Sequence, residues 1–146
     1  MIIEELGIEL FSFEGLYYLE CKQNEDVGIL DYCSEHNILF INYQPFGRNR
    51  TANHNYPLLV ELANKYNKTQ NQILLNNYVK EKNIIPITKA NKIEHIKLNL
   101  EALGFEMEQP DYQSLNDFRC EEFDILEVDW IDNGGLPIYK FANQVE

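Results

Sequence analysis

A single lysine lies between a segment typical of a β-strand and the expected start of a helix. Residues 83–87 (NIIPI) are apolar and rich in isoleucine, which is typical of a buried strand. Lys89 follows two residues later, and NKIE at 91–94 is typical of a capping box with Asn91 as N-cap. A cation and the free N–H groups of a helix N-terminus could together bind a phosphate group. The plainer alternative is a lysine that is simply hydrated.

The distribution of charge favours an anionic ligand in the same part of the chain. The 146 residues carry a formal net charge of −12, from 24 acidic side chains and 12 lysines and arginines. Both ends are strongly acidic, whereas residues 37–118 contain eight acids and nine bases. The overall charge repels phosphate backbones and anionic membranes, so we expect neither nucleic acid nor a membrane as partner. An anionic small molecule would bind in the central region, unless its lysines only solvate helix ends.

The cysteines and the hydropathy narrow the class of protein further. Cys21, Cys33 and Cys120 are odd in number and show no C-x-x-C spacing, so we expect neither a disulfide framework nor a metal site. The first residues are interrupted by acids and lack the basic start of a signal peptide. No apolar run approaches the ~20 residues of a membrane span. These features favour a cytoplasmic protein.

Segments typical of helices and strands alternate along the chain. An amphipathic helix is expected over 25–36, followed by a β-branched strand over 38–43 that should be buried on both faces. A polar loop with Pro45 and Gly47 comes next, and its length is typical of functional loops. Further helices are expected over 57–67, from Thr69 with its capping box TQNQ, from Asn91, and over 109–119. Strands joined by helices indicate an α/β fold with parallel strands.

The last long helix has a clear apolar side. Ile93, Ile96, Leu100 and Leu103 recur at helical spacing, so we expect them to form a buried stripe. Gly104 lies where a helix C-terminus favours a residue with positive φ, so the helix is expected to end there.

Four segments are similar to the aldo/keto reductase family, in the family's order and spacing. NIIPITKANKIEHIKLNL (83–100) resembles the family's V-I-P-I-P-K-A-T-N-P-E-H/R-I-K-E-N-L. DVGILDYCSEHNILFINYQPFGRN (26–49) and LANKYNKTQNQILLNNYV (62–79) resemble two earlier family segments. ALGFEMEQPDYQSLNDF (102–118) resembles the family's closing helix. The resemblance covers about residues 13–118.

The resemblance implies NADP(H) as cofactor and assigns four residues to it. Tyr43 takes the place of the aromatic residue that stacks on the nicotinamide ring. Lys89 takes the place of the lysine that holds the cofactor phosphates, and Asn99 that of the asparagine that contacts adenine. His95 stands where many members have the arginine that holds the 2′-phosphate, and a neutral imidazole is a weaker partner than a guanidinium. No catalytic and no metal-binding residue is assigned.

Three positions depart from the family pattern. Leu98 replaces the glutamate that usually precedes the adenine-binding asparagine, and Asn42 replaces a small alanine next to the stacking tyrosine. Glu14 falls where a glutamine normally meets the nicotinamide amide. These departures predict a weaker affinity for the cofactor.

The resemblance implies only part of the family's barrel. A whole (β/α)8 barrel takes ~250 residues, so we expect an α/β chain that forms a partial TIM barrel of about the last three βα units. It would be a single domain (1–146), with the aldo/keto reductase-like part over 13–118, an irregular acidic N-terminal extension and an acidic C-terminal extension over 119–146. The family's catalytic aspartate, tyrosine, lysine and histidine come from the half that has no counterpart here.

Five other residues have side chains that could act in catalysis. They are Tyr17, Tyr18, Lys22, His36 and His54. Residue type without geometry is no case for a site, so we expect the tyrosines to pack in the core, His36 to end a helix and His54 to lie on a loop.

Three functions follow from these observations. The first is an NADP(H)-dependent carbonyl oxidoreductase of the aldo/keto reductase family, truncated and inactive without the catalytic half. The others are a non-catalytic NADP(H)-binding module and a structural half-barrel that oligomerises. A partial barrel exposes strand edges and an apolar inner face, so a second copy or a separate chain that completes the barrel is an expected partner besides the dinucleotide. The substrate is left open.

Overall fold

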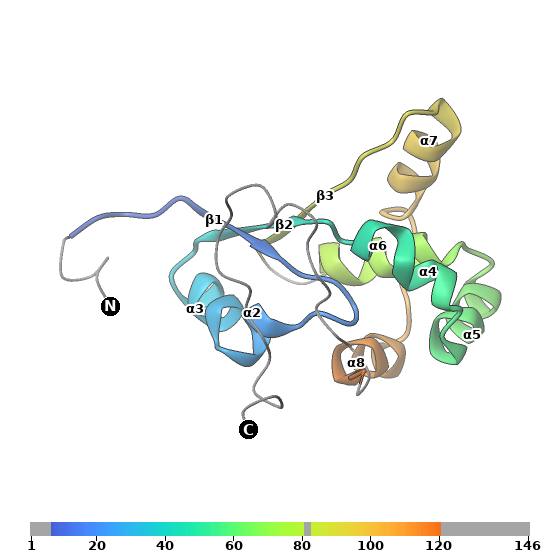
Figure 1. Ribbon diagram of the computed structural model, residues 1–146, viewed down its shortest axis with the longest axis horizontal. Helices are drawn as coiled ribbons and strands as arrows, with labels where there is room; N and C mark the ends of the chain where they lie inside the picture. Colours follow the sequence, from blue (N-terminus) through green and yellow to red (C-terminus); the bar gives the residue numbers. More distant parts are fainter. Residues whose placement is uncertain (1–6, 81–82, 121–146) are drawn as a thin grey trace, which may run out of the picture.

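A parallel sheet organises the chain, as shown by a computed structural model that describes residues 7–80 and 83–120. Its strands in this part of the chain are β1 (Ser12–Leu16), β2 (Leu39–Tyr43) and β3 (Ile84–Ile87). They lie in the order β1-β2-β3, and both neighbouring pairs are parallel (Figure 1). The predicted α/β class with parallel strands is confirmed, and β1 is a strand that the sequence analysis did not identify.

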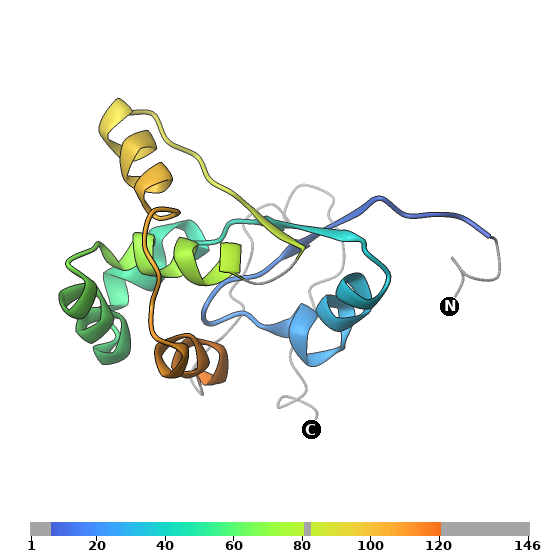
Figure 2. The ribbon, with the colours of Figure 1, turned by 180° about the vertical axis from the view of Figure 1, so that it is seen from behind.

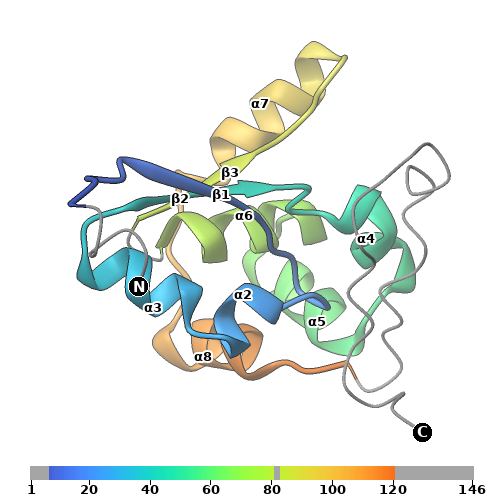
Figure 3. The ribbon, with the colours of Figure 1, turned by 60° about the vertical axis from the view of Figure 1, so that its left-hand side comes forward.

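Helices connect the strands and follow the last one. Between β1 and β2 lie α2 (Gln23–Asp26) and α3 (Ile29–Glu35). Between β2 and β3 lie the 3-10 turn η1 (Gly47–Asn49), α4 (Arg50–His54), α5 (Pro57–Tyr66) and α6 (Gln70–Lys80). After β3 come α7 (Ile93–Glu101) and α8 (Gln109–Asp117). Figure 3 shows α2, α3, α5, α6 and α8 on one side of the sheet, so the described part of the fold is a sheet with one helical layer.

Glycine, asparagine and capping residues determine where several helices begin or end. Gly28 has φ +78 and divides the helix predicted over 25–36 into α2 and α3. Asn67 has φ 51, which ends α5 as a left-handed cap. The Thr69 N–H donates to Gln72 Oε1 at 3.0 Å, and the Gln72 N–H donates to Thr69 Oγ1 at 3.2 Å. The predicted capping box of α6 is therefore confirmed.

The helical layer covers one face of the sheet and forms the core with it. Phe40 on β2 is 1% exposed, and Ile73 and Leu74 on α6 are equally buried. The Tyr17 and Phe40 rings meet edge to face with centroids 6.3 Å apart. Burial of such side chains supplies most of the stability of a domain of this size. The remaining members of the core cluster lie on α3, α5, α6, α8 and the loops around them.

The other face of the sheet is covered much less by the described residues. Along β2, Phe40 and Asn42 are buried, whereas Ile41 between them and Tyr43 are only half-buried. On β3, Ile85 and Ile87 are 46% and 51% exposed. The expectation that 38–43 is buried on both faces is therefore wrong, because apolar composition alone does not show whether a second layer covers a strand.

Helix α7 departs most from its prediction. Its apolar residues do share one side, but they are 47% to 68% exposed: Ile93, Ile96, Leu100 and, just after the helix, Leu103. Figures 1 and 2 show α7 projecting away from the other helices, at the end of the segment that leaves β3. Helical periodicity predicts which residues share a face, whereas burial of that face needs a neighbouring element. The predicted buried stripe is thus wrong for the part of the chain that the structure describes.

The C-terminal end of α7 also differs from its prediction. The helix ends at Glu101, and Ala102 caps it in a right-handed conformation with φ −62. Gly104 is not among the described residues with positive φ. Instead, the Asn76 side-chain amide donates to the carbonyl oxygens of Ala102 and Phe105 at 2.8 and 2.7 Å. Asn76 on α6 therefore fixes the segment that follows α7.

Some predictions lie outside the described residues. The start of the acidic N-terminal extension (1–6) and most of the acidic extension over 119–146 belong to these parts, and the domain boundaries remain predictions.

Candidate functional site

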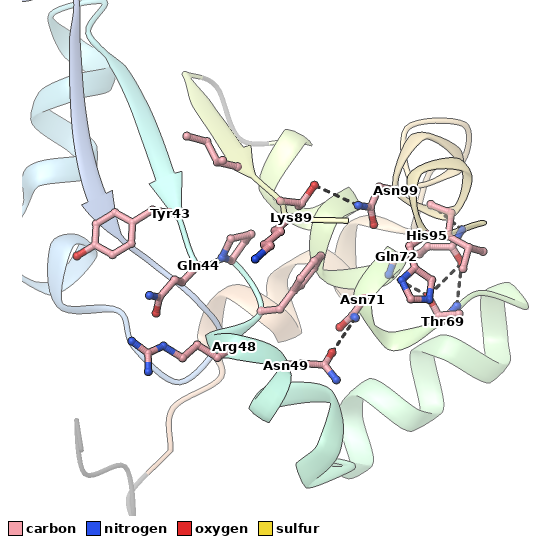
Figure 4. Close-up of a pocket in the computed structure, with 15 residues that line it drawn as sticks. Tyr43, Gln44, Arg48, Asn49, Thr69, Asn71, Gln72, Lys89, His95 and Asn99 are labelled. Carbon is pink, nitrogen blue, oxygen red and sulfur yellow. Dashed lines mark hydrogen bonds between the residues drawn. The ribbon is translucent and has the colours of Figure 1, made fainter. Parts of the chain in front are cut away.

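The carboxyl ends of β2 and β3 border a pocket of about 710 Å³. Its walls come from the turn after β2, from the start of α6, and from the segment that runs from the end of β3 into α7 (Figure 4). This volume is typical of small-molecule sites. In parallel α/β folds, ligands bind at this end of the strands.

All four residues assigned by resemblance line this pocket. Tyr43 is the last residue of β2, and Lys89 lies two residues beyond β3. His95 and Asn99 lie on α7, four residues apart and hence on one side of the helix. In Figure 4, Tyr43 lies at one end of the group and His95 and Asn99 at the other, with Lys89 between them. The structure brings the four together, while their binding roles remain predictions.

Among the residues that the structure describes, no acidic side chain lines the pocket, although the chain carries a net charge of −12. The basic groups that line it are Arg48, Lys89 and His95. The first two are positively charged at neutral pH. Their field favours an anion over a cation or a neutral molecule. The charge pattern of the sequence, which favoured an anionic ligand in the central region, agrees with this lining.

Tyr43 presents a flat ring at the less covered face of the sheet. It is half-buried and lies beside Leu16 of β1 in the strand register. Burial raises the pKa of the Tyr43 phenol, and Cys21 and Glu14 raise it further by smaller amounts. The phenol is therefore neutral at physiological pH. Such a ring can pack against a planar aromatic group and keep its hydroxyl hydrated.

Lys89 and the start of α7 leave several donors available. Lys89 is exposed, and within residues 7–80 and 83–120 its ammonium group forms no hydrogen bond or salt bridge. The N-cap of α7 is Lys92, in an extended conformation and without a side-chain cap. The predicted Asn91 cap is therefore wrong. The first N–H groups of α7 lack the partner that a capping side chain would give, so an anion could accept from them.

Hydrogen bonds from two neighbouring segments fix α7 beside the pocket. Asn99 Nδ2 donates to Thr88 Oγ1 at 3.1 Å, which joins α7 to the segment that leaves β3. Gln72 Nε2 on α6 donates to the carbonyl oxygen of Leu98 at 3.0 Å. These bonds hold α7 although its apolar side is exposed.

The turn after β2 gives the pocket side chains that the sequence analysis did not assign, although it interpreted the length of this loop as typical of functional loops. Gln44, Arg48 and Asn49 have φ of 55, 58 and 66, a region that residues other than glycine rarely adopt. The turn continues into α4, which ends at His54, so His54 is helical and not on a loop as predicted. The polar composition and the length of the loop indicate a turn that could be functional, but not which side chain points into a pocket.

The other candidate catalytic side chains do not converge on the pocket. Tyr17 and Tyr18 are 5% and 4% exposed, so they pack in the core as predicted. His36 caps the end of α3, also as predicted, and its ring stacks on Tyr32 with centroids 3.9 Å apart. Lys22 is buried and donates to the carbonyl oxygens of Leu115 and Asn116 at the end of α8. These side chains have structural roles.

Metal-binding clusters and membrane-spanning helices are both absent from residues 7–80 and 83–120. They contain no group of three or more histidine, cysteine, aspartate or glutamate side chains that could hold a metal ion. None of the helices described is long and apolar enough to cross a membrane.

Comparisons with known proteins agree on one family. The sequence model of the aldo/keto reductase family matches residues 4–120. The Saccharomyces cerevisiae NADPH-dependent alpha-keto amide reductase is 28% identical over 128 residues, covering 84% of this chain and 40% of that protein. The mouse (Mus musculus) aldo-keto reductase family 1 member D1 is 33% identical over 120 residues, covering 76% of this chain and 37% of that protein.

Solved structures show the same fold. A thermostable aldo-keto reductase has a TM-score of 0.73 and 24% identity, over 78% of this chain and 42% of that one. An aldo/keto reductase from Klebsiella pneumoniae, solved with NADP and acetate, has a TM-score of 0.65 and 24% identity, over 72% of this chain and 38% of that one. The chain thus spans about two fifths of the length of these relatives. It belongs to the aldo/keto reductase family.

Proposed function

We propose that this chain provides the NADP(H)-binding part of an aldo/keto reductase, and that carbonyl reduction needs the remaining strands of the barrel. The observation that carries the proposal is the pocket itself. Lys89 and Arg48 give it two permanent cations, and none of its described lining residues is acidic. Tyr43 adds an aromatic face at one end. Its relatives are consistent with this ligand, since the yeast reductase is NADPH-dependent and the Klebsiella structure holds NADP.

The residues present fit a dinucleotide phosphate well. Lys89 would hold a phosphate oxygen, and the free N–H groups at the start of α7 would assist it. Asn99 would face the adenine, with its side chain oriented by Thr88. His95 is exposed on the same side of α7 and would bind the 2′-phosphate more weakly than an arginine. When bound, the nicotinamide supplies the hydride that reduces a carbonyl group, and Tyr43 would orient the nicotinamide ring by stacking.

The exposed apolar surface supports the second half of the proposal. On β3, Ile85 and Ile87 are half exposed, and the strand has no neighbour among the described residues on its outer edge. The apolar side of α7 is likewise exposed. Further strands and helices of an eight-stranded barrel would cover this surface and provide the catalytic side chains. A second copy of the chain or a separate chain would serve as the source of these elements.

Calorimetric titration with NADPH tests the proposed cofactor site. We expect saturable binding, and we expect Lys89→Gln to weaken it about ten-fold or more because a charge-assisted bond to phosphate is lost. Lys97→Gln is the matched control, since Lys97 is an exposed α7 lysine that does not line the pocket. No binding to the wild type, or equal losses in both variants, would contradict the proposed site.

A further inference from the structure

Helix α7 carries a row of apolar side chains that the described part of the chain leaves uncovered. This row, the α7 stripe, is 47% to 68% exposed and consists of Ile93, Ile96, Leu100 and, just after the helix, Leu103. Single exposed apolar residues are normal on a protein surface, whereas several on one side of one helix indicate an interaction site. Figures 1 and 3 show α7 projecting away from the other helices, so a partner can reach it.

The α7 stripe faces away from the helix that holds α7 in place. Ala102, directly after α7, is fully buried, and the Gln72 side chain on α6 donates to the carbonyl oxygen of Leu98 at 3.0 Å. With 3.6 residues per turn, Leu98 and Ala102 lie on one side of the helix and the stripe lies on the opposite side. A partner can therefore bind the stripe without any rearrangement of the fold.

The spacing of the α7 stripe is that of two paired helices. Its residues follow one another at intervals of three, four and three positions, as the a and d positions of a heptad do. Such a seam packs against a second seam when each side chain inserts between side chains of the facing helix. A two-fold axis lets one patch serve both partners, so α7 of a second copy offers a complementary surface.

The charge around the α7 stripe lets two copies of this acidic chain meet there. Residues 89–104 contain three lysines and two glutamates, a net charge of +1, whereas the whole chain carries −12. Two copies that approach through their acidic parts repel each other, and this repulsion is absent at α7. Lysines and glutamates beside the seam can also pair between the two helices.

The area of the α7 stripe fits a weak dimer. Its four side chains expose roughly 350 Å² of apolar surface, and the aliphatic stems of the neighbouring lysines add to it. Two copies would together bury about 1,000 Å², which is at the lower end of specific interfaces. We therefore expect a dissociation constant on the order of 10 μM.

We infer that the chain forms a homodimer in which α7 of one copy packs its stripe against α7 of a second copy. The inference goes beyond the proposed function, because it involves no cofactor and none of the residues that line the pocket. Elements that complete the barrel would cover the same stripe. The homodimer is thus the state of the chain in their absence.

Sedimentation velocity of the full chain between about 1 and 100 μM tests the homodimer. Wild type should change from monomer to dimer as the concentration rises. Leu100→Glu places a charge in the seam and should raise the dissociation constant at least ten-fold. Val27→Glu is the matched control, because Val27 is 62% exposed, lies outside the stripe and gives the same change in charge. Circular dichroism verifies that each variant keeps its fold.

The possible results either support or overturn the homodimer. Wild type that stays monomeric up to about 100 μM would overturn it, and so would Leu100→Glu that associates as tightly as wild type. Equal weakening by Val27→Glu would assign the effect to net charge and also overturn it. Leu100 does not line the pocket, so Leu100→Glu should bind NADPH as wild type does. A chain that dimerises without binding NADPH would keep this inference and contradict the proposed function.

Discussion

Asn99 Nδ2 donates a hydrogen bond to Thr88 Oγ1 over 3.1 Å, and this bond orients a pocket side chain of α7 from the segment that leaves β3. It makes Asn99 a preorganised group rather than a free one. Preorganisation increases affinity because less side-chain entropy is lost when the ligand binds.

Thr88→Val therefore tests the orientation of Asn99 without removing it. Valine keeps the shape of threonine but cannot accept the hydrogen bond, so we expect NADPH affinity to fall about three-fold. The change should raise the dissociation constant in calorimetry and leave the unfolding temperature nearly unchanged. Ser114→Ala on α8 is the control, because Ser114 is not among the lining residues of the pocket. An affinity of Thr88→Val equal to that of the control would show that the bond does not matter for binding.

Asn76 is expected to be the most sensitive polar residue of the core. It is 3% exposed, donates to two carbonyl oxygens after α7, and accepts from the Tyr112 hydroxyl at 2.7 Å. Asn76→Ala leaves these buried groups without a partner, so we expect a loss of about 2–4 kcal/mol in the free energy of unfolding. Urea denaturation measures it, with Asn64→Ala on the exposed side of α5 as control. A loss below about 1 kcal/mol would show that the network contributes little.

Lys22 gives a pH-dependent prediction. Burial lowers the pKa of its ammonium group from 10.5 to about 8. Because the folded value lies below the unfolded one, the unfolded chain binds this proton more tightly between these two pH values. Stability contributed by Lys22 therefore rises from about pH 8 to pH 10.5, by at most ~3 kcal/mol, and is constant below pH 8.

Comparison with Lys22→Met isolates that contribution from the titration of other groups. Urea denaturation of both proteins across this pH range should show wild type gaining stability relative to the variant as pH rises. A difference that stays constant would mean that Lys22 keeps an ordinary pKa in the folded chain. Loss of its bonds to the carbonyl oxygens of Leu115 and Asn116 should lower the stability of the variant at every pH.

The apolar residues on the exposed side of α7 should tolerate polar substitution with little loss of stability. Leu100 is 63% exposed, so Leu100→Ser should cost less than about 0.5 kcal/mol of the free energy of unfolding of the isolated chain. Leu59 is fully buried, and Leu59→Ala should cost roughly 2–5 kcal/mol. Denaturation with urea compares the two. A cost above about 1 kcal/mol for Leu100→Ser would mean that something covers this side, and sedimentation would then show whether it is a second copy.

Local patterns predicted the parts of the fold that depend on neighbouring residues. The Thr69 capping box and Pro57 at the start of α5 needed only a few adjacent side chains, and both are present as predicted. The stripe on α7 failed for the opposite reason, since burial depends on elements distant in sequence. Periodicity indicates which side of a helix is apolar and is silent on what packs there.

The same limit applies to the site: positions that follow from the order of the elements could be predicted, and those that depend on distant contacts could not. Lys89 follows a strand and precedes a helix, so its position at the carboxyl end of the sheet could be inferred from order alone. The position of the Arg48 side chain could not be inferred in this way. Its direction depends on several positive-φ residues, and the polar sequence after Pro45 does not specify them. The contacts of Gly47 with Tyr18 and of Asn49 with Asn71 join residues more than 20 positions apart, and they became visible only in the structure.

The most direct test of the central claim is a titration of NADPH with the full chain, followed by nicotinamide fluorescence and repeated with Tyr43→Leu. The account predicts a saturable change in emission for wild type, and an altered spectrum with weaker binding for the variant, because the stacking ring is lost. Emission that never saturates, or that changes identically with Tyr43→Leu, would contradict a nicotinamide site at the end of β2.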